Sequence, residues 1–102
     1  MIKEYTEFEG KYYVMLSEET QLSVIIKIKL IKEDEDLKCL QLIGTDINFD
    51  VNLGDISEFE NISKMIFNTL DEAVLYVELQ NKIPMIMDEY YLERLNKSRE
   101  NK

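Results

Sequence analysis

The stretch LSVIIKIKLIK, residues 22–32, has the alternating pattern of a β-strand. Apolar side chains occupy every second position from Val24 to Leu30, and lysines fall between them. Because successive side chains of a strand point to opposite faces, one face of this segment is expected to be buried. Ile25 and Ile31 stand on the second face, which indicates that this face is also partly covered.

Two further strands are expected, one before this stretch and one after it. Residues 12–16, YYVML, form a short β-prone run, and the polar SEET at 17–20 has the length of a hairpin loop. The charged run KEDED at 32–36 predicts a turn. After it, LKCLQLIG at 37–44 is mostly apolar, which is typical of a central strand.

The next stretch, DINFDVNLGD at residues 46–55, allows two interpretations. Its side chains alternate between oxygen-bearing and apolar, and oxygen ligands stand at every second position at the start of a calcium-binding loop. Such a loop, counted from Asp46, requires glycine sixth and glutamate twelfth, but Val51 and Ser57 stand there. Strict alternation therefore favours a strand at 46–53 that ends at Gly54. The inward side chains of this strand would be Ile47, Phe49, Val51 and Leu53.

The segment from 56 to 67 has a mixed pattern. Asp55 and Glu58 are close to a capping box and indicate a helical turn at 56–61. However, NISKMIF at 61–67 alternates well enough for a fifth strand. We expect a helical turn at 56–61 followed by a strand at about 62–67.

Two helices are expected after this segment. Thr69 and Glu72 form a T-x-x-E capping box, and an apolar stripe of helical spacing follows them. Pro84 disfavours helix at the preceding residue, so this helix should end by about Lys82. A second helix is expected within 85–98. Its apolar face would consist of Met87, Tyr91, Leu92 and Leu95.

These elements predict one α+β domain. We expect an antiparallel β-meander of four to five strands followed by two C-terminal helices packed on the sheet, within residues 1–98. Residues 99–102 are expected to form a frayed C-terminal tail. No apolar run is long enough to span a bilayer, and the start of the chain has no secretory pattern, so we expect a cytoplasmic protein.

The residues that usually carry catalysis are scarce. The chain has no histidine, which removes the commonest general base and the histidine-based metal sites. Its one cysteine, Cys39, lies in an apolar run, and its three glycines are too scattered for a phosphate-binding loop. We therefore expect no catalytic, cofactor-binding or metal-binding residues, and no enzyme activity.

The formal net charge of the chain is −9, and most of the excess lies in residues 1–60. Such a charge repels nucleic acid and anionic membranes and attracts basic surfaces. We therefore expect neither direct nucleic-acid binding nor membrane binding. The expected partner is a basic protein surface, such as that of a nuclease or another nucleic-acid-binding protein.

The predicted strand at 46–53 would hold carboxylates outward at regular spacing. Alternate strand residues lie about 6.7 Å apart, so Asp46 and Asp50 would be separated by about 13 Å. This order of negative charge resembles, in spacing and sign, the phosphates that a nucleic-acid-binding protein expects. The run at 33–36 is expected to be a solvated acidic loop. The predicted partner-binding residues are Asp46, Asp50, Asp55, Glu58, Glu60, Glu33, Asp34, Glu35 and Asp36.

Three classes of small protein share this acidic, catalytically empty character. The first is a phage or mobile-element inhibitor of a defence nuclease that acts as a nucleic-acid mimic, as anti-restriction and anti-CRISPR proteins do. The second is an immunity protein that neutralises a nuclease toxin. The third is a plain adaptor or subunit whose acidity serves solubility. The first class is the favoured hypothesis, and it rests on analogy of character.

Overall fold

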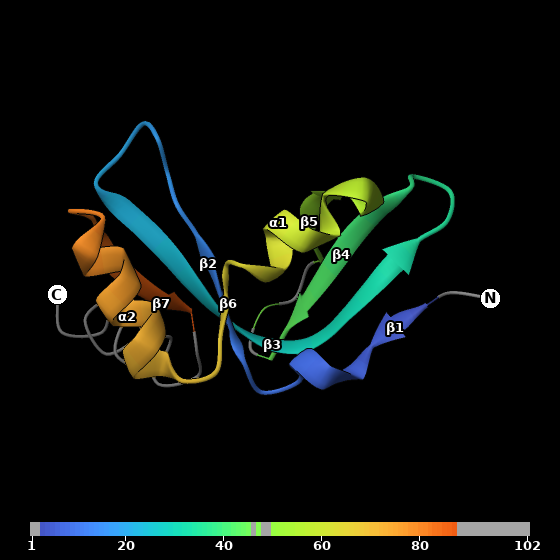
Figure 1. Ribbon diagram of the computed structural model, residues 1–102, viewed down its shortest axis with the longest axis horizontal. Coiled ribbons are helices and arrows are strands. Elements are labelled where there is room, and N and C mark those ends of the chain that lie inside the picture. The colour runs from blue at the N-terminus through green and yellow to red at the C-terminus, as the bar shows by residue number, and fades with distance from the viewer. Residues whose placement is uncertain (1–2, 46, 48–49, 88–102) are drawn as a thin grey trace, which may run out of the picture.

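The computed structural model describes residues 3–45, 47 and 50–87 of the chain (Figure 1). Within them the α+β class is confirmed: most of the structure is a sheet, accompanied by two short α-helices. The elements are β1 (Glu4–Tyr5), η1 (Thr6–Phe8), β2 (Tyr12–Met15), β3 (Leu22–Asp34), β4 (Cys39–Gly44), β5 (Asp50–Asp55), η2 (Ile56–Glu58), α1 (Phe59–Ser63), β6 (Ile66–Phe67), α2 (Leu70–Leu79) and β7 (Ile83–Met87).

The long strand β3 joins two half-sheets (Figure 1). Its first half pairs with β2 on one edge and with β7 on the other, whereas its second half pairs with β1 and β4. The register shifts between Ile28 and Leu30, and such a bulge bends a strand. The β7 half-sheet consists of β6, β2, the first half of β3 and β7. The β5 half-sheet consists of β1, the second half of β3, β4 and β5.

The strand order β5-β4-β3-β2-β6 is antiparallel throughout, as a meander requires, but β7 pairs with β3 in parallel. The helix predicted within 85–98 is therefore wrong for Met85–Met87, which belong to β7. A short apolar run suits either a helix or a strand, and pairing with β3 decides it here. Pro84 is compatible with this place because β7 has only one neighbouring strand among the described residues. Residues 88–98 lie outside the described part.

Two strand boundaries differ from the prediction. The predicted turn at 32–36 starts too early, because β3 continues to Asp34 and the turn occupies 35–38. Of the predicted strand at 46–53, Ile47 is not in a strand; β5 covers Asp50–Asp55 and continues through Gly54, whose φ of 123° accompanies a register shift against β4. The alternation itself is confirmed within β5, since Asp50 and Asn52 are exposed whereas Val51 and Leu53 are half-buried. Asp46, Asn48 and Phe49 lie outside the described residues.

The mixed segment contains both predicted elements in the predicted order. Its helical part, η2 followed by α1, extends to Ser63, and only Ile66–Phe67 remain as strand β6. Both described α-helices precede β7 in the chain. The predicted order, a complete meander followed by two helices, is therefore right only in part.

Helix α2 begins and ends as its local sequence dictates. The Thr69 side chain accepts a hydrogen bond from the backbone N–H of Glu72 at 3.2 Å, which confirms the predicted cap. At the other end Asn81 adopts a φ of 59°, and the N–H of Lys82 donates to the carbonyl of Val77 at 3.2 Å. Asparagine tolerates this left-handed conformation, which closes the helix and turns the chain into β7.

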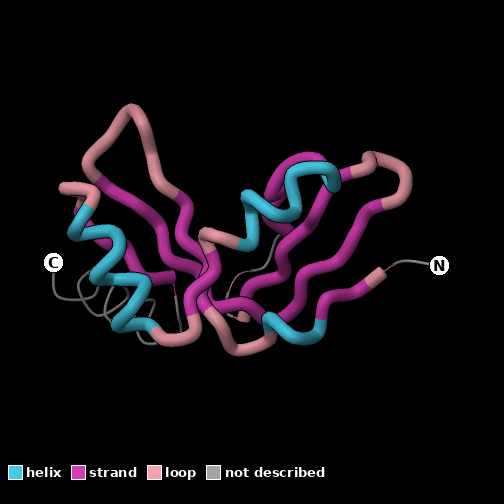
Figure 2. The backbone as a smooth tube through the Cα atoms, in the orientation of Figure 1, coloured by secondary structure: helices cyan, strands magenta, loops and turns pink. Residues whose placement is uncertain are grey.

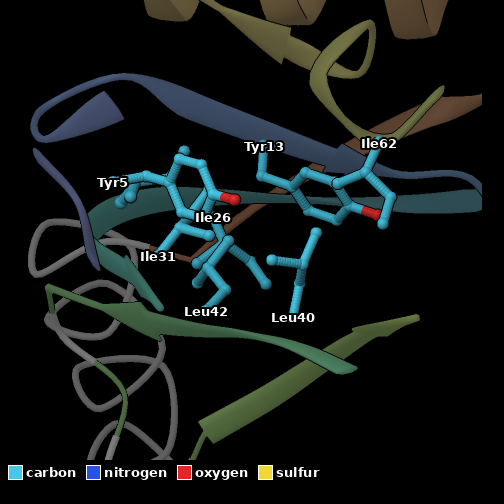
Figure 3. Packing of buried hydrophobic residues seen from close by; sticks show 8 residues of the cluster. Tyr5, Tyr13, Ile26, Ile31, Leu40, Leu42 and Ile62 are labelled. Carbon is cyan, nitrogen blue, oxygen red and sulfur yellow. The ribbon is translucent and has the colours of Figure 1, made fainter. Parts of the chain in front are cut away.

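The hydrophobic core forms two clusters. Under α2, the buried side chains of Ala73 and Val77 pack against Val14 and Ile25 on one face of the β7 half-sheet. The larger cluster lies where the two half-sheets meet; Figure 3 shows its aromatic and aliphatic side chains facing one another between the strands. Its buried members are Tyr5, Tyr13, Ile26, Ile28, Ile31, Leu40, Leu42 and Ile62.

Candidate protein-binding surface

Two acidic segments that are separate in the sequence meet at one end of the β5 half-sheet. Asp34 pairs with Cys39, and Cys39 pairs with Asp55, so the three residues form one row across β3, β4 and β5. Neighbouring strands lie about 4.8 Å apart, which places the backbones of Asp34 and Asp55 about 10 Å from each other. The N–H of Ile56 also donates to the carbonyl of Lys38 at 3.2 Å, which joins η2 to the β3–β4 turn (Figure 2). We call Asp34, Glu35, Asp36, Asp55 and Glu58 the acidic end.

The β3–β4 turn is held by one of its own carboxylates. The Asp34 Oδ1 atom accepts hydrogen bonds from the N–H groups of Asp36 and Leu37, at 3.0 and 3.1 Å. Lys38 then adopts a φ of 53° before the chain enters β4. The backbone of the turn therefore has a defined shape, which fixes the point from which its acidic side chains project.

Asp55 is fixed in a similar way on the neighbouring strand. Its Oδ1 atom accepts a hydrogen bond from the N–H of Ser57 at 2.8 Å and so caps η2. The hydrogen bonds from Ser57 and the nearby positive charge of Lys38 lower the pKa of the Asp55 carboxyl below its ordinary value. Because its pKa is low, Asp55 stays ionised as the pH falls.

The strand face that carries Asp50 is less negative than the sequence indicates. The Lys32 ammonium lies 3.8 Å from the Asp50 carboxylate, and the two side chains are 30% and 49% exposed. Asp46 and Asn48, which would continue the row of alternating polar residues, lie outside the described residues. The charge of Asp50 is thus partly offset by Lys32.

The remaining predicted residues are divided between two other places. The Glu33 Oε1 atom accepts a hydrogen bond from the Tyr5 hydroxyl at 2.6 Å, which directs this carboxylate towards the core side of the sheet. Burial, the hydrogen bond and the negative charge of Glu33 raise the pKa of Tyr5 to about 12. Glu60 is exposed in α1, past the end of η2.

Metal-binding groups and reactive thiols are two features that often mark a chemical site. No group of three or more histidine, cysteine, aspartate or glutamate residues is placed to hold a metal ion there. Cys39 is buried, and its sulfur accepts a hydrogen bond from the Gln41 amide at 3.1 Å, as expected for a core residue. Within residues 3–45, 47 and 50–87, no helix is long and apolar enough to cross a membrane.

Comparison of the chain with protein-family models, with curated proteins and with solved structures finds no match in any of the three. A functional assignment therefore depends on the chemistry of the surface. The acidic end combines two carboxylates that accept backbone hydrogen bonds, those of Asp34 and Asp55, with the exposed side chains of Glu35, Asp36 and Glu58.

Proposed function

We propose that this protein acts without catalysis, by binding a basic surface of another protein through its acidic end. The observation that supports the proposal is the row formed by Asp34, Cys39 and Asp55, which brings two acidic segments together. The acidic end has five carboxylates and the same turn has one lysine, Lys38, so their formal net charge is −4. Such a field accelerates association with a basic partner and selects against acidic ones.

The kind of partner follows from the chemistry of its basic surface. A nucleic-acid-binding site places lysine and arginine side chains where phosphates lie, and duplex DNA carries one charge for about each 1.7 Å of helix axis. Asp34 and Asp55 lie on the strands at either side of β4, with their backbones about 10 Å apart, so the acidic end can contact two such basic side chains at once. We therefore propose that the partner is a nuclease of a defence system, and that the protein blocks its nucleic-acid site as a phage inhibitor would.

This proposal depends on the acidic end rather than on the face of β5 that carries Asp50. Because Lys32 lies beside Asp50, neutralising Asp50 should weaken binding less than neutralising residues of the acidic end. An immunity protein that neutralises a nuclease toxin would use the same contact. A toxin gene beside the gene for this chain would favour that alternative.

A matched pair of variants tests the contact. In Glu35→Gln/Asp36→Asn/Glu58→Gln, three carboxylates of the acidic end become amides of the same shape. In the control, Glu18→Gln/Glu19→Gln/Glu78→Gln, the same net charge is removed from exposed positions associated with the β7 half-sheet. Both variants are titrated into DNA cleavage reactions of restriction and RNA-guided nucleases.

We expect the wild type to inhibit at least one nuclease class, and the acidic-end variant to inhibit it at least 10-fold less. That factor corresponds to about 1.4 kcal/mol of binding free energy, about 0.5 kcal/mol for each lost charge. The control variant should inhibit within about threefold of the wild type. Equal losses in both variants would show that only net charge matters and would refute a specific contact. Absence of inhibition of every nuclease tested would refute the proposed function.

One observation favours the adaptor as a second candidate. Leu75 and Leu79 are 58% and 70% exposed, and their i, i+4 spacing places them on one face of α2. An exposed apolar pair suits a stable protein interface. A Leu75→Ser/Leu79→Ser variant that loses a co-purifying partner, while the acidic-end variant keeps it, would favour the adaptor.

A further inference from the structure

The turn between β3 and β4 carries a large apolar side chain among acidic ones. Leu37 is 67% exposed, and it directly follows Glu35 and Asp36 in the sequence. Among the described residues, it is a member of neither hydrophobic cluster. Burial of a leucine side chain is favourable because it removes apolar surface from water. The folded chain leaves most of this gain at Leu37 unused.

The turn itself does not require leucine at this position. The N–H of Leu37 donates to the Asp34 Oδ1 atom at 3.1 Å, but every residue except proline has this backbone group. Turns favour glycine, asparagine, aspartate and serine, because these residues adopt unusual dihedral angles or bond the nearby backbone. Neither the turn nor the core therefore explains the side chain of Leu37, whereas a contact outside the chain would explain it.

The place of Leu37 in the fold suits such a contact. Single exposed leucines are common on protein surfaces, and what distinguishes Leu37 is a turn of defined shape within the acidic end. Asp34 accepts the N–H groups of both Asp36 and Leu37, and Lys38 adopts a φ of 53° directly after them. A segment that already has its bound shape loses little conformational entropy on binding. Leu37 is therefore presented to a partner at low cost.

We propose that Leu37 inserts into an apolar pocket of the partner that is bordered by lysine and arginine side chains. This inference rests on the proposed function and adds the chemistry of the contact to it. Charge complementarity selects the pocket: Glu35 and Asp36 directly precede Leu37, and Asp34 and Asp55 lie in the row at the base of the turn. An apolar side chain in a pocket, surrounded by polar contacts, is the usual centre of a protein interface.

A nucleic-acid-binding site has this combination of groups. Bases stack on aromatic side chains, while lysines and arginines beside them contact the phosphates. Leu37 would take the place of a base, and the carboxylates beside it would take the place of phosphates. The acidic end would thus imitate both parts of a nucleotide, whereas carboxylates alone imitate only its charge.

Three variants test the contact, with the nuclease that the wild type inhibits. Leu37→Ser removes the apolar side chain, and Leu37→Met keeps one of similar size. Leu22→Ser is the matched control, because Leu22 is 42% exposed and lies at the opposite end of β3 from Asp34. The inhibition constant of each is measured at about 50 and about 200 mM salt. Thermal unfolding followed by circular dichroism checks that each variant is folded.

We expect Leu37→Ser to inhibit about 10-fold less at both salt concentrations, a factor that corresponds to about 1.4 kcal/mol. Its salt slope should equal that of the wild type, because no charge is lost. Leu37→Met and Leu22→Ser should inhibit within about threefold of the wild type.

The outcomes separate this inference from the proposed function. Wild-type inhibition by a folded Leu37→Ser variant would refute the apolar contact, and the proposed function would stand if the acidic-end variant still inhibits less. Equal losses in Leu37→Ser and Leu22→Ser would also refute it, because the position of the leucine would then be irrelevant. A wild type that inhibits no nuclease would refute both.

Discussion

Replacing Tyr5 by phenylalanine should destabilise the protein in a pH-dependent way. The Tyr5 ring is 7% exposed and stacks on Phe59 with 4.7 Å between ring centroids, and phenylalanine keeps this packing. What the variant loses is the hydrogen bond from the hydroxyl to Glu33, which is 2.6 Å long. A bond of this length to a carboxylate is among the stronger side-chain hydrogen bonds.

The size of the effect follows from the surroundings of Glu33. A hydrogen bond to a charged group contributes about 1.5–3 kcal/mol to stability. Because Glu33 is only half-buried, water can solvate its carboxylate in the variant, so we expect a loss near the lower limit, about 1.5 kcal/mol. For a domain of this size that loss lowers Tm by roughly 6–12 °C.

The sign of the pH dependence follows from the raised pKa of Tyr5. The folded state favours the neutral phenol, so the stability that this group contributes is complete below a pH of about 10. It is lost as the pH rises through about 12. The stabilities of wild type and Tyr5→Phe should therefore converge on going from neutral to strongly alkaline solution.

Urea unfolding followed by circular dichroism, at neutral pH and at steps up to pH 12, measures both effects. Tyr76→Phe is the matched control, because the Tyr76 hydroxyl donates to the Met65 sulfur, a weak acceptor, at 3.7 Å. The control should lose less than about 0.5 kcal/mol. A Tyr5→Phe variant as stable as the wild type at neutral pH would refute the reasoning. A difference that stays constant to pH 12 would refute its alkaline part.

Three further changes test local features of the fold. Thr69→Ala removes the cap of α2 and should reduce the free energy of unfolding by about 1 kcal/mol, whereas Thr69→Ser should keep it; equal losses would contradict capping. Gly54→Ala should reduce the free energy of unfolding, measured with urea, by about 1–3 kcal/mol, because φ is 123° at this position. Steric contact is not the cause, since the nearest side-chain atom is 3.8 Å from the new Cβ. An unchanged free energy of unfolding would show that β5 can adopt another backbone conformation. In a ¹³C NMR titration the Asp55 carboxyl should have a pKa below its ordinary value, so the stability that it contributes is present above a pH of about 4 and is lost on further acidification. Asp55→Asn should flatten this part of the acid unfolding curve. An ordinary pKa would contradict the cap of η2.

The local signals in this sequence predicted most of the elements well. The alternation around Val24 identified β3, and the capping box at Thr69 identified the start of α2. Both are decided by side chains close in sequence, which is why they could be predicted. The parallel pairing of β7 with β3 is different, because it joins segments that are far apart and a short apolar run has no period long enough to decide.

The sequence could predict which residues are acidic at the candidate site, but not how the fold brings them together. The sequence identified both acidic segments, but their junction through Asp34, Cys39 and Asp55 depends on sheet register. The same register brings Lys32 within 3.8 Å of Asp50, although no lysine lies near Asp50 in the sequence. The hydrogen bond that directs Glu33 towards Tyr5 arises from β1, a two-residue strand too short for any pattern to reveal.

The salt dependence of inhibition tests the central claim most directly. For the nuclease that the protein inhibits, the inhibition constant is measured from about 50 to about 200 mM salt with the wild type and with Glu35→Gln/Asp36→Asn/Glu58→Gln. We predict that the wild type weakens steeply with salt and that the variant, already weaker at low salt, has a clearly shallower slope. Identical slopes would show that the acidic end does not contact the nuclease, and the proposed function would be wrong.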